Sequence, residues 1–277
     1  STRKESSAAS DVYKRQPDRY AVKMLDWRGH EWDFTGDWAA GIISGGIDGL
    51  VGSLVDTTAQ PLGLPGQVVL SQHAEPMAGS LTFHCREDAH RSAAQVQADL
   101  RAAFSGVAGR RNELVVSSPV GDAHAFVRLN GVVPPPVEDP SWGEVVLNMQ
   151  VPVVCDEGVW WVPAPAAEGD VVVSNFGDVP VWVRIRWSGG GGRVVLPSGA
   201  SFTLPPAGEE RVLYLSRQES LVVRKPDGGI DFDLWAAVRA NMRGVSPERV
   251  PVDSERRFRL PAGAQIEYEV GVMDPWQ

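Results

Sequence analysis

Short segments in which apolar residues occupy every second position recur along this 277-residue chain. One such segment, 264–273, carries on a single face Ala264, Ile266, Tyr268, Val270 and Val272. A two-residue period is typical of a β-strand that has one face in a core. Beyond residue 170, segments of this kind follow one another closely and are separated by turn signals such as Pro-Asp-Gly-Gly at 226–229. This spacing predicts a β-sandwich in the C-terminal part of the chain.

The first half of the chain is also expected to be rich in strands. Residues 80–87 and 144–153 alternate as strands do, whereas Val96, Leu100 and Phe104 recur at the spacing of a helix. We expect this helix near residues 89–106, with Asp88 as its N-cap. A second short helix is expected at 233–244, begun by an aspartate and ended by a glycine. The fold class is therefore mainly β with one or two helices.

Changes in composition divide the chain into domains. Residues 162–170 are rich in Pro, Ala and Gly, so 163–169 are expected to be a linker. We expect an N-terminal β-rich domain over 17–162 and the C-terminal sandwich over 170–277. Residues 1–16 resemble the translation of a common transposon-based sequencing adaptor, and we expect them to be non-native and disordered.

Charge and cysteine content limit the classes of function. The formal net charge is −9, which argues against a general affinity for nucleic acid or for an anionic membrane. No apolar run approaches the ~18 residues of a membrane span. The two cysteines do not make a disulfide framework, and we expect them to be buried free thiols in a protein assembled in a reducing cytosol.

Few motifs for catalysis or metal binding are present. His84, Cys85, Asp88 and His90 are residue types that bind metals, but alternation places Cys85 on the apolar face and His84 on the opposite one. The Gly-rich segment 41–53 lacks the Lys of a phosphate loop, so we expect a flexible surface loop there. No serine lies in a nucleophile elbow. We therefore expect no catalytic residues, no bound metal and no cofactor, and predict that the chain is not an enzyme.

A strand at 179–187 has an unusual outward face. Its apolar residues alternate with Trp182, Arg184 and Arg186, where a solvent-facing row is expected to be simply polar. The bland explanation is a solvated face with arginine stems lying over the sheet. We favour a face covered by another surface, because Trp and Arg are common anchors at interfaces. The chain has ten tryptophans, and we expect most of the others to fill the cores.

Three stretches resemble a known family. LDWRGHEWDFTG at 25–36 resembles the opening of minor tail proteins from long-tailed, siphovirus-type bacteriophages of actinobacteria. VVVSNFGDVPVWVRIRWSG at 171–189 resembles the Asn-x-Gly-x-x-Pro-Val-aromatic-x-Arg-Ile strand that begins their C-terminal domain. The ending YEVGVMDPWQ resembles their usual Asp-Pro-Trp terminus. In this order, the motifs are similar to those of the distal tail protein family over most of residues 20–277.

The resemblance implies a structural role at the virion tail tip, after assembly in the host cytoplasm. Such proteins form a ring, usually a hexamer, whose N-terminal parts continue the tail tube and carry the baseplate hub. Their C-terminal galectin-like β-sandwich faces outward and supports host-binding parts. The implied partners are further copies of the chain, tail-tube proteins and tail-tip hub proteins. The long Gly-rich segment 41–66 and the helix at 233–244 are not required by this resemblance.

Two other functions compete with the tail-tip role. The tryptophan content, together with the galectin-like resemblance, makes a carbohydrate-binding module for host cell-wall glycans the main alternative, and it could coexist with a hub role. A cell-wall hydrolase ranks last, because no linear spacing shows the pair of carboxyl groups that it needs.

Overall fold

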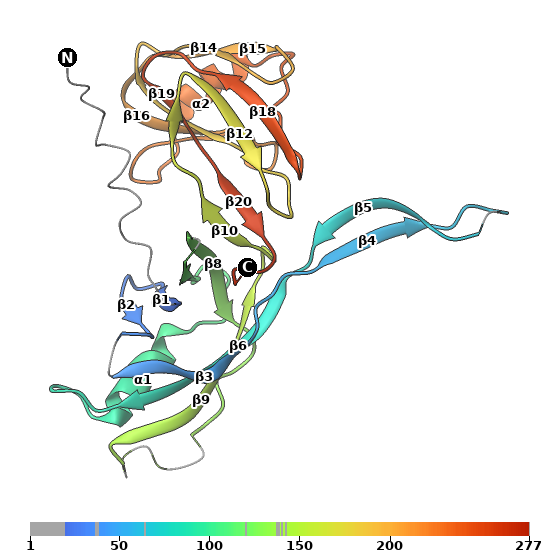
Figure 1. Ribbon diagram of the computed structural model, residues 1–277. Coiled ribbons are helices and arrows are strands. Elements are labelled where there is room, and N and C mark those ends of the chain that lie inside the picture. The colour runs from blue at the N-terminus through green and yellow to red at the C-terminus, as the bar shows by residue number, and fades with distance from the viewer. Residues whose placement is uncertain are drawn as a thin grey trace, which may run out of the picture. The chain divides into compact units, whose positions relative to one another are not determined.

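The computed structural model describes residues 20–36, 39–63, 65–119, 121–136, 139, 141 and 143–276 (Figure 1). Over this part of the chain the structure consists of many short strands and two helices. The predicted fold class, mainly β with one or two helices, is therefore confirmed. The adaptor-like residues 1–16, Trp38 and Trp142 lie outside the described residues.

The chain divides into two compact units. Unit 1 contains the described residues up to Trp160 and, in addition, those from Met273 onward. Unit 2 is Trp161–Val272. The expected linker lies at the start of unit 2 and includes the two-residue strand β11 (Ala167–Glu168). That the segment is a linker between domains remains a prediction.

Unit 1 is built on a sheet whose strands run in the order β2–β1–β7–β8–β9–β6–β3. The bounds are β1 (Ala21–Leu25), β2 (Glu31–Asp33), β3 (Ala40–Gly49), β6 (Met77–Arg86), β7 (Asn112–Ser118), β8 (Gly121–Leu129) and β9 (Val145–Cys155). The neighbours along this path pair in antiparallel fashion. β10 (Trp160–Pro163) and β20 (Glu269–Val272), whose residues after Trp160 belong to unit 2, pair with each other.

The helix α1 (Ala93–Ala103) packs against β6 and β9. Its Val96 and Leu100 are fully buried, as the periodicity predicted. The predicted N-cap is wrong, however: the cap is Ser92, which forms a reciprocal capping box with Gln95. Asp88 instead accepts hydrogen bonds from the backbone and guanidinium of Arg91, and so closes the turn before the helix.

The Gly-rich segment is not a surface loop, and this expectation is corrected. Residues 40–49 form β3, which pairs with β6 through Ala40 opposite Cys85 and Gly49 opposite Gly79. Glycine suits β3 because its backbone approaches that of β6 closely: a Cβ at Gly49 would stand 2.5 Å from the carbonyl oxygen of Ala78. The low β-propensity of glycine misled the sequence prediction.

Between β3 and β6 the chain forms an antiparallel hairpin that the sequence did not predict. β4 (Leu54–Ala59) and β5 (Val68–Ala74) pair only with each other, as a separate two-stranded sheet. The hairpin reaches away from the rest of unit 1 (Figure 1). We call residues 54–74 the arm.

Unit 2 is a sandwich of two antiparallel sheets. One runs β11–β19–β13–β16–β17 and the other β12–β18–β14–β15. The bounds are β12 (Asp170–Asn175), β13 (Arg184–Gly189), β14 (Gly192–Val195), β15 (Ser201–Leu204), β16 (Ala207–Tyr214), β17 (Val223–Arg224), β18 (Ser254–Arg259) and β19 (Ala264–Glu267). Their apolar faces meet in one core that contains Ile185 and Trp187 from the first sheet and Phe202 and Phe258 from the second. The predicted β-sandwich is thus present.

The second helix, α2 (Phe232–Asn241), packs against β15 and β17. The sequence placed its start at Asp233, but the N-cap is Asp231, whose carboxylate accepts a hydrogen bond from the backbone of Leu234. Asp231 also pairs with the Arg211 guanidinium at 2.9 Å. The hydrogen bond from Arg211 lowers the pKa of Asp231 below its ordinary value.

Candidate functional site

The predicted face of Trp182, Arg184 and Arg186 lies on one side of the first sheet of unit 2. The strand is shorter than predicted and begins at Arg184, but the burial still alternates from Val181 to Trp187. Trp182 and the two arginines are half-buried on the side away from the core. They therefore share a face, as the two-residue period required.

Both arginines on this face form ion pairs within unit 2. Arg186 donates to Glu267 of β19 at 2.6 Å and to Glu210 of β16 at 2.5 Å. Both carboxylates raise the pKa of the Arg186 guanidinium, and the hydrogen bond to Glu267 is the largest cause. Arg184 pairs with Glu269 at 3.1 Å, and its guanidinium lies 5.9 Å from the ring centre of Tyr214. The arginine positions are therefore explained by cross-strand pairing, which leaves Trp182 as the unexplained residue of the three.

The first family motif surrounds a buried carboxylate. Asp26, whose side chain is fully inaccessible, accepts hydrogen bonds from the backbone N–H groups of Arg28 and His30. It also accepts from the Arg28 guanidinium and the Trp32 indole. Burial alone would raise the pKa of Asp26, but these donors outweigh it and the pKa is lowered. The motif therefore fixes the turn between β1 and β2.

The second motif depends on a buried amide. The side chain of Asn175 donates to the carbonyl oxygens of Val179 and Val250, and it accepts from the backbone of Gly177. A Cβ at Gly177 would stand 2.4 Å from the carbonyl oxygen of Gly271, so this position requires glycine. The motif residues thus set the turn that leads into the strand carrying Trp182.

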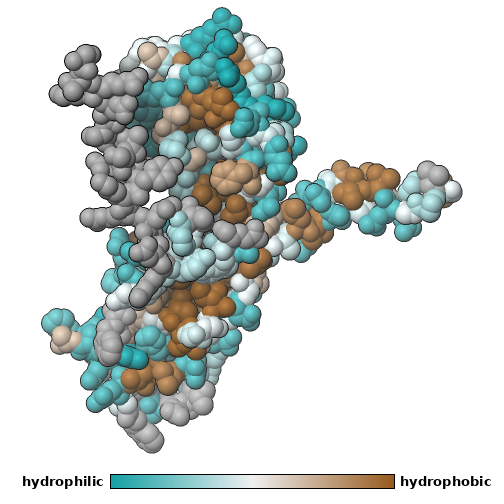
Figure 2. All heavy atoms as spheres, in the orientation of Figure 1, coloured by the Kyte–Doolittle hydropathy of each residue, from teal (hydrophilic) through white to brown (hydrophobic). Residues whose placement is uncertain are grey.

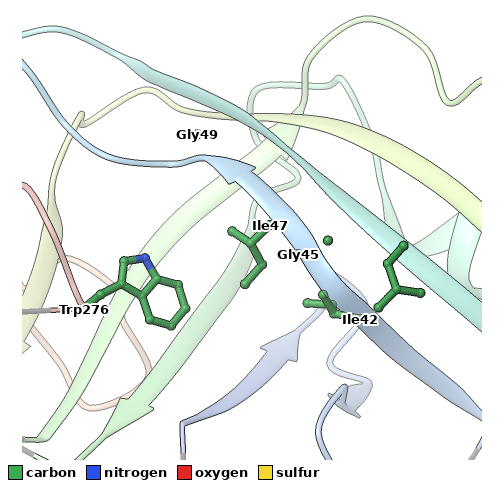
Figure 3. A pocket seen from close by; sticks show the side chains of 7 residues that line it. Ile42, Gly45, Ile47, Gly49 and Trp276 are labelled. Atoms are coloured by element: carbon green, nitrogen blue, oxygen red, sulfur yellow. The ribbon is translucent and has the colours of Figure 1, made fainter.

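The third motif brings the C-terminal segment back to unit 1. The carboxylate of Asp274 accepts a hydrogen bond from the backbone of Trp276, and the Trp276 ring lies 5.7 Å from that of Tyr20. Trp276 also forms one wall of a hollow of about 310 Å³ (Figure 3). The other lining residues all belong to β3, and we call the site the β3 hollow: Ile42, Ile43, Gly45, Gly46, Ile47 and Gly49.

The hollow arises from an irregularity in the pairing of β3 with β6. Ile42 pairs with Phe83 and Ile47 with Leu81, so four residues of β3 lie opposite Thr82 alone. Such a bulge re-aims side chains and bends the strand. β3 is also the last strand of its sheet, although the start of its edge is occupied, because Ile42 donates its backbone N–H to the carbonyl oxygen of Phe34 at 3.3 Å. Sequence reasoning missed this site because it treated the segment as a loop.

The candidate metal ligands do not converge. Cys85 is fully buried, whereas the His84 ring lies over Gly41 on the other face of the sheet. Within the described part of the chain, no group of three or more His, Cys, Asp or Glu side chains could hold a metal ion. No helix in the same residues is long and apolar enough to cross a membrane.

Tryptophan burial differs from the expectation. Trp32, Trp160 and Trp187 are buried, but the remaining tryptophans that the structure describes are exposed or half-buried: Trp27, Trp161, Trp182, Trp235 and Trp276. Trp235 lies on α2 beside Phe232, which is 66% exposed, with their ring centres 6.1 Å apart. Of these five, Trp235 still packs against the core of unit 2, so the prediction that most tryptophans fill the cores holds for fewer residues than expected.

Neither a family model nor a curated protein sequence matches this chain. Solved structures do share its fold, and they come from a phage hub adsorption apparatus and a phage baseplate. The Dit protein (gp 19.1) of phage SPP1, described as a paradigm of the hub adsorption apparatus in phages that infect Gram-positive bacteria, is similar with a TM-score of 0.58 at 10% identity. The match covers 90% of this chain and 98% of that one.

A chain of the phage P2 baseplate, in its activated conformation with Ca, gives a TM-score of 0.56 at 8% identity. A chain of the same baseplate with Sr gives a TM-score of 0.53 at 7% sequence identity. Each match covers 91% of this chain and 98% of the other. The predicted resemblance to the distal tail protein family is confirmed at the level of the fold.

Proposed function

We propose that this chain is a structural subunit of a phage tail tip: a distal tail protein that forms a ring, most simply a hexamer, and joins the tail tube to the host-recognition parts. The observation that carries the proposal is the extent of the fold similarity. It covers 90% of this chain and nearly all of SPP1 Dit, so it includes residues of unit 1 and of unit 2. A shared single domain would be weaker support, because common folds host many functions.

The three motifs support a siphovirus-type phage of actinobacteria as the source. Each motif forms a turn or an end segment rather than a reactive centre, as the contacts of Asp26 and Asn175 illustrate. The comparable solved structures are hub and baseplate proteins. We therefore propose that the protein is not an enzyme. It is a component of the virion tail and is assembled into the tail in the host cytoplasm.

In this proposal unit 1 forms the ring and unit 2, a galectin-like sandwich, supports host-recognition parts. The face of Trp182, Arg184 and Arg186 is proposed as a contact with another surface of the assembly. Because the arginines already have carboxylate partners, the energetic anchor of that contact is Trp182.

Electron microscopy of the purified protein tests the ring. The protein is imaged in negative stain at high concentration, alone and with its tail-tube and hub partners. Ring-shaped particles with a central channel are expected. Particles that remain monomeric under every one of these conditions would contradict the proposal.

A second candidate function, which is compatible with the first, is carbohydrate binding by unit 2. The supporting observation is the aromatic pair on α2 formed by the exposed Phe232 and the half-buried Trp235, where the Arg239 guanidinium lies 5.5 Å from the indole centre. The test is binding of host cell-wall glycans to the whole chain and to the Trp235→Ala and Trp182→Ala variants. No binding at millimolar glycan would remove this candidate.

A further inference from the structure

The arm exposes an apolar surface that a monomer does not need. Leu62 is fully exposed, and Val68, Val69 and Leu70 of β5 are 52%, 48% and 65% exposed. Figure 2 shows brown, hydrophobic spheres on the surface of the arm. An isolated two-stranded hairpin is marginally stable in water, so such a surface is expected to be covered in the working state.

The arm also lacks the charges that normally guard a free strand edge. Residues 54–74 contain no Lys and no Arg, and their one carboxylate is Asp56, in the half near unit 1. Natural edge strands usually carry charged residues, especially Lys, that prevent pairing with other chains. The outer half of the arm is therefore suited to contact a neutral, apolar partner.

Hydrogen bonds at its base direct the arm away from its own sheet. Glu75 donates its backbone N–H to Ser53 at 3.1 Å, Leu50 donates to Ala78 at 3.2 Å, and Gly52 donates to Met273 at 2.8 Å. Leu50 itself is buried. These contacts hold both ends of the arm, so its tip extends outward and does not fold back onto β3 of the same chain (Figure 1).

The β3 hollow has the complementary properties. Its walls are three isoleucines and an indole, and no charged side chain among the described residues lines it. It lies beside the edge of β3, where Ile42 already donates its N–H to Phe34 but the later residues pair in the described chain with β6 alone, so a strand from another chain can pair there. Gly45 and Gly49, with φ values of +70° and +71°, adopt a backbone conformation that favours glycine and leave the hollow without side chains at these positions (Figure 3).

We propose that the outer arm of one copy docks into the β3 hollow of a second copy, a contact that deepens and rests on the proposed ring. Copies with a net charge of −9 repel each other, so they are best joined where acidic side chains are missing, as in the arm tip and the hollow. Because the outer arm and the β3 hollow are different surfaces of one chain, the contact is heterologous. A contact of this kind closes into a ring when its rotation allows.

Disulfide trapping tests the contact directly. Leu62→Cys protein is mixed with Ile43→Cys protein under mild oxidation, and Thr203→Cys on unit 2 replaces Leu62→Cys in the control mixture. Native Cys85 and Cys155 do not compete, because both are buried and burial raises their pKa values. A dimer cross-linked between residue 62 of one copy and residue 43 of another is expected in the first mixture, and no dimer cross-linked between residues 203 and 43 is expected in the control. Equal cross-linking in the two mixtures would overturn the proposal.

Charge substitution separates the contact from ring formation itself. Leu70→Glu and Ile43→Glu are each expected to weaken self-association at least about tenfold in sedimentation velocity. Ser71→Glu adds the same charge to the arm outside its apolar residues and is expected to change association less than about threefold. Far-ultraviolet circular dichroism checks that each variant is folded.

The outcomes distinguish the two proposals. If rings form and Leu70→Glu and Ile43→Glu leave their dissociation constant unchanged, the docking contact is wrong and the ring stands. If the unaltered chain never self-associates, alone or with its tail partners, both are wrong.

Discussion

The carbonyl oxygen of Glu75 lies 2.0 Å from the position that a Cβ would occupy at Gly158. Two backbone segments more than eighty residues apart in sequence thus touch at the base of the arm. Gly158 also has a φ of +72°, which favours glycine. The turn after β9 and the base of the arm can hold their positions only while residue 158 has no side chain.

Gly158→Ala is expected to destabilise the protein by at least about 2 kcal/mol, because backbone atoms cannot yield as a flexible side chain would. Gly109→Ala is the matched control, since its Cβ would meet nothing within 4 Å and its φ is not positive. Urea unfolding measures the free energy of unfolding of both variants. Equal stability of the two variants would show that the close approach is not rigid.

Asp26→Asn is expected to lower the free energy of unfolding by about 2 kcal/mol at neutral pH, through loss of charge-assisted hydrogen bonds. The folded-state pKa of Asp26 lies below its ordinary value of 3.8. The ionised Asp26 carboxylate therefore makes its full contribution to the free energy of unfolding at pH values above 3.8. This contribution is lost as the pH falls through the folded-state pKa. Unfolding curves of both proteins should differ at pH 7 and converge as the pH falls below about 4. A difference independent of pH would exclude the carboxylate as its origin.

The two aspartates at the start of α2 should behave differently. Asp231→Ala removes the helix cap and the partner of Arg211, and a loss of about 1–2 kcal/mol is expected. Asp233→Ala, at an exposed first-turn position, should cost no more than about 0.5 kcal/mol. Thermal unfolding monitored by calorimetry compares them. A larger loss for Asp233→Ala would restore the N-cap predicted from the sequence.

Both thiols should resist modification in the folded protein. Burial raises the pKa of Cys85 to about 12 and also raises that of Cys155, so little thiolate is present near pH 8. A colorimetric thiol reagent should react slowly with the native protein and quickly with both thiols in guanidinium chloride. Fast reaction of a native thiol would mean that its strand opens readily.

Trp182→Ala combined with Arg184→Ala tests the predicted face of unit 2. The melting temperature of the whole chain should change little, because both side chains lie outside the core. Assembly with tail partners should weaken, by about tenfold or more if Trp182 is an interface anchor. Unchanged assembly and unchanged glycan binding would mean that this face is exposed to solvent.

The sequence allowed prediction of those features that depend on local periodicity. Alternation identified β6 through Leu81 and Phe83, and the helical spacing of Val96 and Leu100 identified α1. The same alternation placed Trp182, Arg184 and Arg186 on a single face. Periodicity is informative here because each element buries one side against a core.

Features set by distant residues could not be predicted. Arg186 pairs with Glu267, 81 residues later, and only the antiparallel register of β13 and β19 brings them together. The sequence did not predict β3, because its glycines are required by the close approach of the β6 backbone and glycine has a low β-propensity. The arm was missed because a hairpin without a core gives no one-sided alternation.

Unit 2 leaves unit 1 after Trp160 and returns to it at Met273, so it is topologically an insertion within the first unit. The exit and return segments are strands that pair with each other, which keeps the two connections adjacent. Any domain whose ends are similarly close could in principle be exchanged at this position while unit 1 keeps its own chain segments. The sandwich therefore has the topology of a cassette, joined to the first unit by two adjacent connections.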